Sequence, residues 1–75
     1  MTTAVLIERL ADLEHQQWMH WAQAVIAAEP GLAADRVARW RACFVAYAAL
    51  PEALKELDRT WARRVLALLE PEVQR

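Results

Sequence analysis

The sequence predicts an all-α fold, a small three-helix domain with a long first helix and an extended connection before the last helix. Sixteen of the 75 residues are Ala and only one is Gly, and Ala has the highest intrinsic helix propensity. Apolar side chains recur at three- and four-residue intervals in the first and last thirds of the chain, the period of an amphipathic helix. No stretch apart from residues 44–47 carries the β-branched and aromatic residues of a strand.

The first helix begins after Thr2 or Thr3, because either hydroxyl can cap a free backbone N–H. It ends at residues 29–31, Glu-Pro-Gly, because the residue before a proline is disfavoured in the helical region. Such a helix is about 37 Å long, so we expect it to bend or to extend into a partner. Glu8 falls outside its buried stripe, which we expect to comprise Leu6, Leu10, Leu13, Gln17, Trp21, Ala24 and Ala28, widened by Ile7, Trp18 and Val25.

The second helix is expected over residues 34–43 and the extended connection over residues 45–50. Pro51 suits the first position of the third helix, where its missing N–H has no helical partner to lose. Residues 70–71, Glu-Pro, are expected to end that helix. Its buried stripe is predicted to comprise Leu54, Leu57, Trp61, Val65, Leu68 and Leu69.

The length predicts one domain, residues 1–75. The net charge is −1, with nine basic residues spread along the chain, so we do not expect a nucleic-acid partner. No apolar run approaches the roughly 20 residues of a membrane-spanning helix. One cysteine and no secretory leader pattern favour a cytoplasmic location. Four tryptophans exceed what so small a core needs. At least two are expected to fill the core of the monomer, and the excess predicts a homo-oligomer or a pocket.

The residue types also argue against an enzyme, and we expect no catalytic residues. The chain contains no serine, and its only glycine, Gly31, cannot form a glycine-rich phosphate loop. His15 and His20 are five residues apart and so do not share a helix face. With a single cysteine beside them, we expect no metal site and no cofactor.

Six polar or aromatic residues nevertheless stand out: His15, Trp18, Tyr47, Lys55, Asp58 and Arg59. His15 and Trp18 are neighbours on one helix face, and Asp58 falls within an apolar stripe, where a lone carboxylate is costly. One interpretation is architectural, with Asp58 accepting a hydrogen bond from His15, Trp18 or a backbone N–H. The other is that the set surrounds a site for an anionic or aromatic ligand, since Arg binds phosphate and aromatic rings stack on bases.

Two segments carry a resemblance to a known family. Residues 10–18 (LADLEHQQW) and 45–59 (VAYAALPEALKELDR) resemble the ryanodine-receptor-type (RyR) repeat domain, above all its small stand-alone versions in phages and prophages. The family pattern is LAxxxHxxW, followed by VPYxxL and KxxDR. The departures are Ala46, where the family has Pro, and residues 21–40, which do not reproduce the family's Gly-Trp region.

The resemblance implies a non-enzymatic, phage- or prophage-encoded protein in the host cytoplasm that binds a small anionic or nucleotide-like ligand, and a role as a host defence antagonist. Trp18 and Tyr47 would stack on the ligand, and Lys55 and Arg59 would neutralise its phosphate. Asp58 would orient Arg59, His15 or a ligand hydroxyl. The alternative is a helical module for protein–protein interaction or oligomerisation that binds no small ligand.

Overall fold

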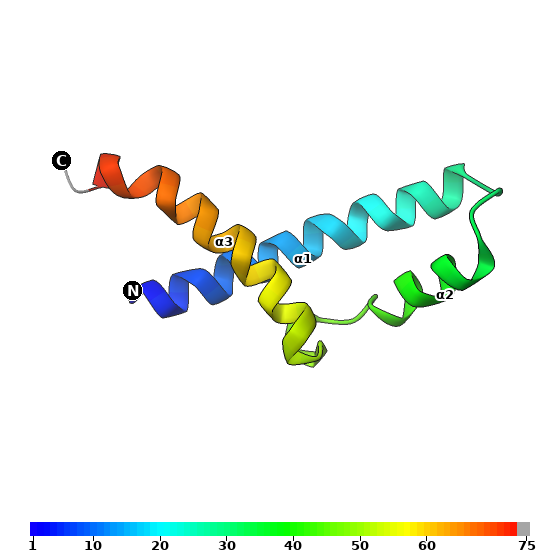
Figure 1. Cartoon of the computed structure of the whole chain (residues 1–75), viewed down its shortest axis with the longest axis horizontal. Helices are drawn as coiled ribbons and strands as arrows, with labels where there is room; N and C mark the ends of the chain where they lie inside the picture. Colours follow the sequence, from blue (N-terminus) through cyan, green and yellow to red (C-terminus); the bar gives the residue numbers. More distant parts are fainter. Residues whose placement is uncertain (74–75) are drawn as a thin grey trace.

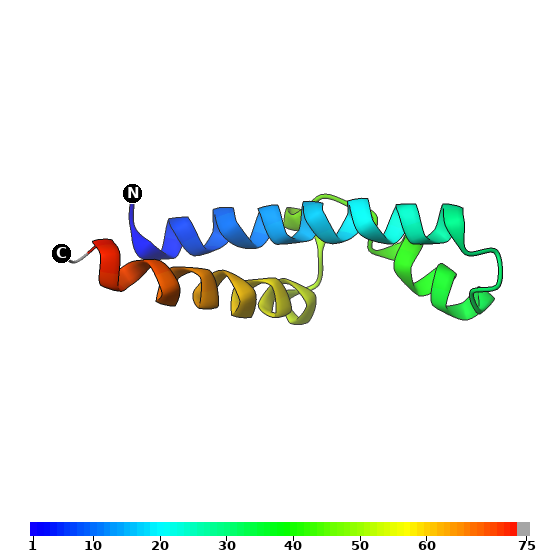
Figure 2. The ribbon, with the colours of Figure 1, turned by 90° about the horizontal axis from the view of Figure 1, so that it is seen from above.

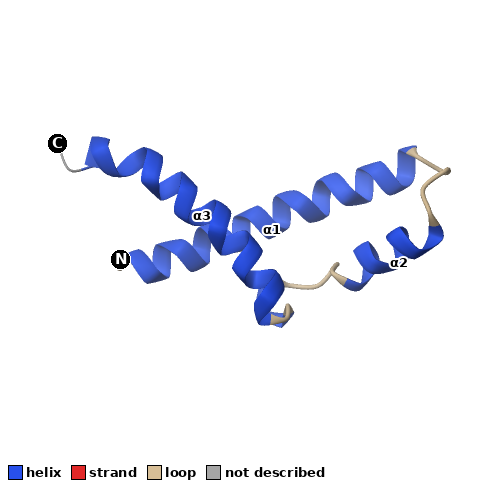
Figure 3. Cartoon of the chain, viewed as in Figure 1, coloured by secondary structure: helices blue, strands red, loops and turns tan. Residues whose placement is uncertain are grey.

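The computed structural model describes residues 1–73, with the side chains of residues 1–69, and contains helices only (Figures 1 and 3). The elements are α1 (Thr3–Ala28), α2 (Ala34–Ala42), a short 3-10 turn η1 (Tyr47–Ala49) and α3 (Glu52–Val73). This architecture confirms the all-α prediction and the long first helix. No helix within residues 1–73 has the length and apolar character required to cross a bilayer.

The ends of α1 lie where the sequence predicts them. The Thr2 hydroxyl oxygen accepts a 3.1 Å hydrogen bond from the backbone N–H of Val5, which satisfies one of the free donors in the first turn. At the other end, Glu29 is the capping residue and its N–H donates to the carbonyl of Val25. Pro30 follows directly and the helix does not continue.

Two boundary predictions need correction. The connection before α3 is not extended throughout, because Tyr47–Ala49 form a 3-10 turn closed by a hydrogen bond from the Leu50 N–H to the Tyr47 carbonyl. This turn carries Tyr47 into the interior. The third helix also does not end at residues 70–71 but continues to Val73, because a proline makes the residue before it a common helix boundary but not an obligatory one.

The helix α1 is the element on which the others lie. In Figure 1 α3 crosses α1, and in Figure 2 α3 and α2 both lie along one side of it, α3 at its N-terminal half and α2 at its C-terminal end. The result is elongated, with principal extents of 49 × 22 × 15 Å. No residue of α2 is buried.

The contact between α1 and α3 is built on alanines. Ala11 of α1 and Ala62 of α3 are fully buried and form one cluster with Tyr47 and Leu50. Small side chains let two helix backbones approach closely, which turns the larger apolar side chains toward the flanks. The buried positions of α1 are Ala11, His15 and Ala22. None of these three residues belongs to the stripe that the sequence predicted to be buried.

The predicted stripe of α3 was also wrong in part. Leu54 and Val65 are half-buried, but the other members are exposed to at least half of their surface, at 63% for Leu57, 53% for Trp61, 79% for Leu68 and 50% for Leu69. Alanines occupy the fully buried positions of the α1–α3 contact, so these large side chains remain largely exposed within the described chain.

Candidate functional site

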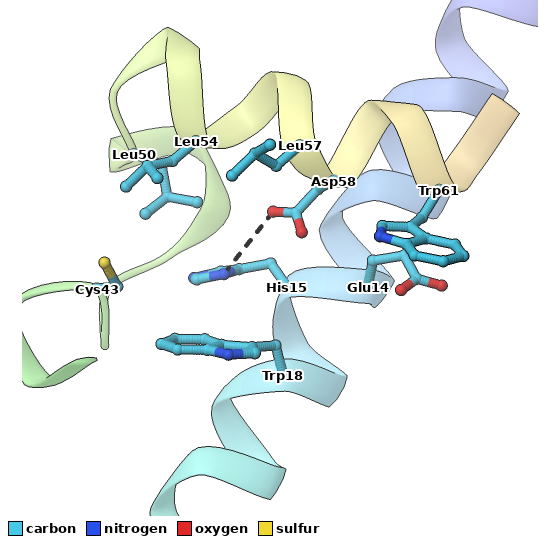
Figure 4. Close-up of a pocket in the computed structure, with 9 residues that line it drawn as sticks. All are labelled: Glu14, His15, Trp18, Cys43, Leu50, Leu54, Leu57, Asp58 and Trp61. Atoms are coloured by element: carbon cyan, nitrogen blue, oxygen red, sulfur yellow. Dashed lines mark ion pairs between the residues drawn. The ribbon is translucent and has the colours of Figure 1, made fainter. Parts of the chain in front are cut away.

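Two adjacent turns of α1 present His15 and Trp18 on the same side. Their rings stack, with centroids 6.0 Å apart and planes inclined by 16°, as Figure 4 shows. His15 is 3% exposed. Its Nε2 lies 2.7 Å from the carbonyl oxygen of Val45. Because a carbonyl oxygen can only accept, Nε2 carries the proton and a neutral His15 has its free lone pair on Nδ1.

Asp58 of α3 faces that second nitrogen. The distance between His15 Nδ1 and Asp58 Oδ2 is 3.9 Å, which is too long for a direct hydrogen bond. Burial raises the pKa of the Asp58 carboxyl; the charge of His15 opposes this rise and the carboxylate of Glu14 adds to it. His15 is one of the three partners of Asp58 that the sequence leaves open, and the two side chains are neighbours without the expected hydrogen bond. Their contact is an ion pair only when His15 is protonated.

These residues border a groove with a volume of about 360 Å³ between α1, α3 and the segment that precedes η1. Trp61 lies beside Glu14 at one edge of the groove (Figure 4). The lining contains the carboxyl groups of Glu14 and Asp58, and no Lys or Arg contributes. The lining residues are Glu14, His15, Trp18, Cys43, Leu50, Leu54, Leu57, Asp58 and Trp61.

The other three predicted site residues form a separate cluster around Glu8. The Tyr47 hydroxyl donates to Glu8 Oε2 at 2.7 Å, and Arg59 Nε donates to Glu8 Oε1 at 2.6 Å. Arg59 Nη1 also lies 2.9 Å from Glu52 and 3.4 Å from Glu56. Three carboxylates therefore surround this guanidinium.

Lys55 belongs to the same cluster. Its Nζ lies 3.5 Å from a carboxylate oxygen of Glu52 and 5.7 Å from the centroid of the Tyr47 ring. The hydrogen bond from Arg59 is the main cause that lowers the pKa of Glu8, and the nearby carboxylates raise the pKa of Arg59. Burial, followed by the hydrogen bond to Glu8, raises the pKa of Tyr47 to about 12.

The six predicted residues thus do not converge on one site. His15, Trp18 and Asp58 line the groove, whereas Tyr47, Lys55 and Arg59 do not. Sequence reasoning missed Glu8 and Trp61. Both carry a signal at helical spacing, since Glu8 lies three residues before buried Ala11 and Trp61 lies three residues after Asp58.

An aromatic cluster attaches α2 to the end of this site. The Trp18 ring contacts Trp40 of α2 edge-on at 6.2 Å and Phe44 at 5.7 Å, between centroids. Trp40 also meets Trp21 at 5.5 Å. Trp18 therefore has one face toward His15 and its remaining edges among aromatic rings, which fixes its orientation in the groove.

No protein-family model, curated protein sequence or solved structure matches this chain. The resemblance to the RyR repeat domain therefore stays a prediction. Within the part of the chain that the structure describes, no group of three or more His, Cys, Asp or Glu side chains is placed to hold a metal ion.

Proposed function

We propose that this protein is a non-enzymatic binding module whose groove binds a flat ring with N–H donors. The ring either carries an amidinium group or is an amino-substituted nitrogen heterocycle. The observation that carries the proposal is the pairing of stacked rings with free acceptors in one groove. Its volume of about 360 Å³ falls in the range of small-molecule sites.

The spacing of the two acceptors supports a donor between them. His15 Nδ1 and Asp58 Oδ2 are 3.9 Å apart, so a ligand nitrogen can lie at about 2.9 Å from each of them. A group with two N–H bonds then satisfies both acceptors at once. Trp18 contributes apolar surface to the same lining for the remainder of the ligand.

The charges in the groove argue against a phosphate as the bound group. Glu14 and Asp58 are its only ionisable carboxyl groups, and the basic side chains of Lys55 and Arg59 are engaged with carboxylates outside it. A carboxylate with a donor-bearing cation gives a charge-assisted hydrogen bond. We therefore favour a neutral or cationic ring over the anionic ligand expected from the sequence. If the ligand is nucleotide-like, the groove would hold its base and not its phosphate.

Benzamidine and benzoate test this proposal because they have nearly the same shape and opposite charges. We expect benzamidine to bind with a Kd of about 1 mM or tighter, and to shift the indole N–H signals of Trp18 and Trp61 in NMR spectra more than that of Trp21. Benzoate should produce no such shifts. Equal binding of the two probes, or binding of neither, would overturn the proposal.

A matched pair of variants identifies the acceptor. Asp58→Asn keeps the shape of the side chain but removes its charge, and we expect it to weaken benzamidine binding at least about tenfold. Asp35→Asn changes an exposed carboxylate on α2 that pairs with Arg39 and should leave binding unchanged. Equal affinities in the two variants would exclude Asp58 as the recognition group. Thermal unfolding of both variants separates lost binding from lost stability.

A helical assembly module is the second candidate function. It is favoured by the exposure of Leu57, Trp61 and Leu68 along α3. Leu68 lies outside the groove lining, so a small-ligand site does not explain its exposure. This function requires no ligand, and its experimental test is the mass of the protein in solution.

A further inference from the structure

We propose that a second copy of this chain packs against the stripe formed by Leu57, Trp61 and Leu68 of α3 and closes the open side of the groove. The three residues are spaced by four and seven positions, so they lie on one side of the helix. Each exposes more than half of its surface. We call this surface the α3 stripe.

The buried core of the protein is so small that large apolar side chains, those of the α3 stripe among them, remain exposed. Among residues 1–69, no large side chain is fully buried, and the completely inaccessible residues are Ala11, Ala22 and Ala62. The radius of gyration is 14.9 Å, whereas a compact chain of this length has about 11 Å. The chain is therefore a layer of helices with one apolar side of α3 open to solvent.

The amount of surface indicates one further copy as the occupant. The accessible surface is 5663 Å², against about 4,700 Å² for a compact monomer of 8.6 kDa. The elongated chain thus exposes more surface than a compact monomer does, by an amount sufficient to supply the roughly 800 Å² that each partner buries in a standard protein interface. A two-fold axis through the α3 stripe would place the same surface of both copies in contact, as in most homodimers.

The charges around the stripe permit such self-contact. Glu14 lines the groove together with Trp61, and the Arg64 guanidinium lies 4.6 Å from the centroid of the Trp61 ring. The border of the stripe thus carries both signs. The whole chain has a net charge of only −1, so two copies approach without strong mutual repulsion.

The same contact changes the groove. Leu57 and Trp61 belong to both the α3 stripe and the groove lining, so the second copy would cover the side on which the groove is open. This part of the inference rests on the proposed ligand-binding function, whereas self-association does not. Closure would remove water from Asp58 and strengthen its bond to a ligand donor.

Light scattering coupled to size-exclusion chromatography tests the association without any ligand. We expect twice the 8.6 kDa mass at micromolar concentration for the natural sequence. Leu68→Lys places a charge on the most exposed member of the stripe but outside the groove lining, and should yield a monomer with unchanged helical circular dichroism. Ala67→Lys adds the same charge to the neighbouring exposed residue, off the stripe, and should remain a dimer.

The inference is overturned if the natural sequence is a monomer at about 100 μM, because its dissociation constant is then weaker than that of a stable interface. It is also overturned if the Leu68→Lys variant keeps the mass of a dimer. The first of these results does not depend on how the variants fold. A benzamidine titration of the Leu68→Lys monomer separates the two proposals. Weaker binding than in the natural dimer supports closure, unchanged binding refutes closure alone, and absence of binding in both proteins refutes the ligand proposal alone.

Discussion

The Arg59 guanidinium of α3 donates a 2.6 Å hydrogen bond to the Glu8 carboxylate of α1, although the two residues are 51 positions apart. The second oxygen of the same carboxylate accepts from the Tyr47 hydroxyl at 2.7 Å. One glutamate therefore connects both long helices and the 3-10 turn. Tyr47 is the buried member of this cluster, so the effect of losing its bond is the most readily measured.

Tyr47→Phe removes this hydrogen bond while it keeps the aromatic ring. We expect the free energy of unfolding to fall by about 1 kcal/mol, the typical contribution of such a bond. For a domain of this size, that loss lowers Tm by about 4–8 °C. Thermal unfolding followed by circular dichroism measures the change.

A double-mutant cycle with Glu8→Gln provides the control for that prediction. If the Tyr47 hydroxyl acts through Glu8, Tyr47→Phe costs less stability in the Glu8→Gln background than in the natural sequence. Equal costs in both backgrounds would mean that the contact contributes nothing to stability.

The ionisation of Tyr47 gives a second prediction, and the chain has no other tyrosine to obscure it. The near-ultraviolet absorbance of tyrosinate should titrate with a pKa of about 12 in the folded protein and near 10 in concentrated urea. A folded pKa raised above the unfolded value means that its stabilising contribution is full below pH 10 and is lost as the pH rises through about 12. A folded midpoint near 10 would contradict the burial and the bond to Glu8.

The alanine contact between α1 and α3 gives a third prediction. Ala62→Leu forces a larger side chain into a fully buried position, and we expect it to lower the free energy of unfolding by about 1–3 kcal/mol. Ala67→Leu, on an exposed site of the same helix, is the matched control and should change stability little. Urea denaturation measures both, and equal midpoints for the two variants would contradict close packing at Ala62.

A fourth prediction concerns α2, which has no buried residue and is attached through aromatic contacts. Few buried contacts imply a low free energy of local opening. Amides of residues 34–42 should therefore exchange with deuterium faster than those in the middle of α1, and Trp40→Ala should accelerate this exchange further. Arg41→Ala, at an exposed position of α2, should not. Equal exchange in α1 and α2 would refute the weak attachment of α2.

Both ends of α1 and the start of α3 were predictable because their determinants are local. Thr2 caps α1, Pro30 follows its last turn and Pro51 precedes α3, and each acts on its own neighbours in the chain. The proximity of His15 and Trp18 was predictable for the same reason, since three residues correspond to nearly one helical turn.

The inward faces of the helices and the partners of Arg59 were not predictable. Apolar residues, the alanines included, are distributed so widely around α1 that its spacing pattern fits several rotations. The structure has the rotation that places alanines in the contact. Arg59 meets Glu8 only because α3 crosses α1 at Ala62 and Ala11, a relation between distant segments. Helical periodicity within one segment does not contain that information.

The segment that leads into α3 is fastened to α1 at two places. His15 donates to the carbonyl of Val45, and Glu8 accepts from Tyr47. The direction in which α3 leaves is therefore determined by α1 and not by α2, which lies earlier in the chain. Residues 29–43, which include α2, form a connecting segment. We expect that residues can be added to it or removed from it without displacing the two long helices. Variation in length is thus expected to concentrate between Pro30 and Cys43, while the spacing from His15 to Asp58 in space stays constant.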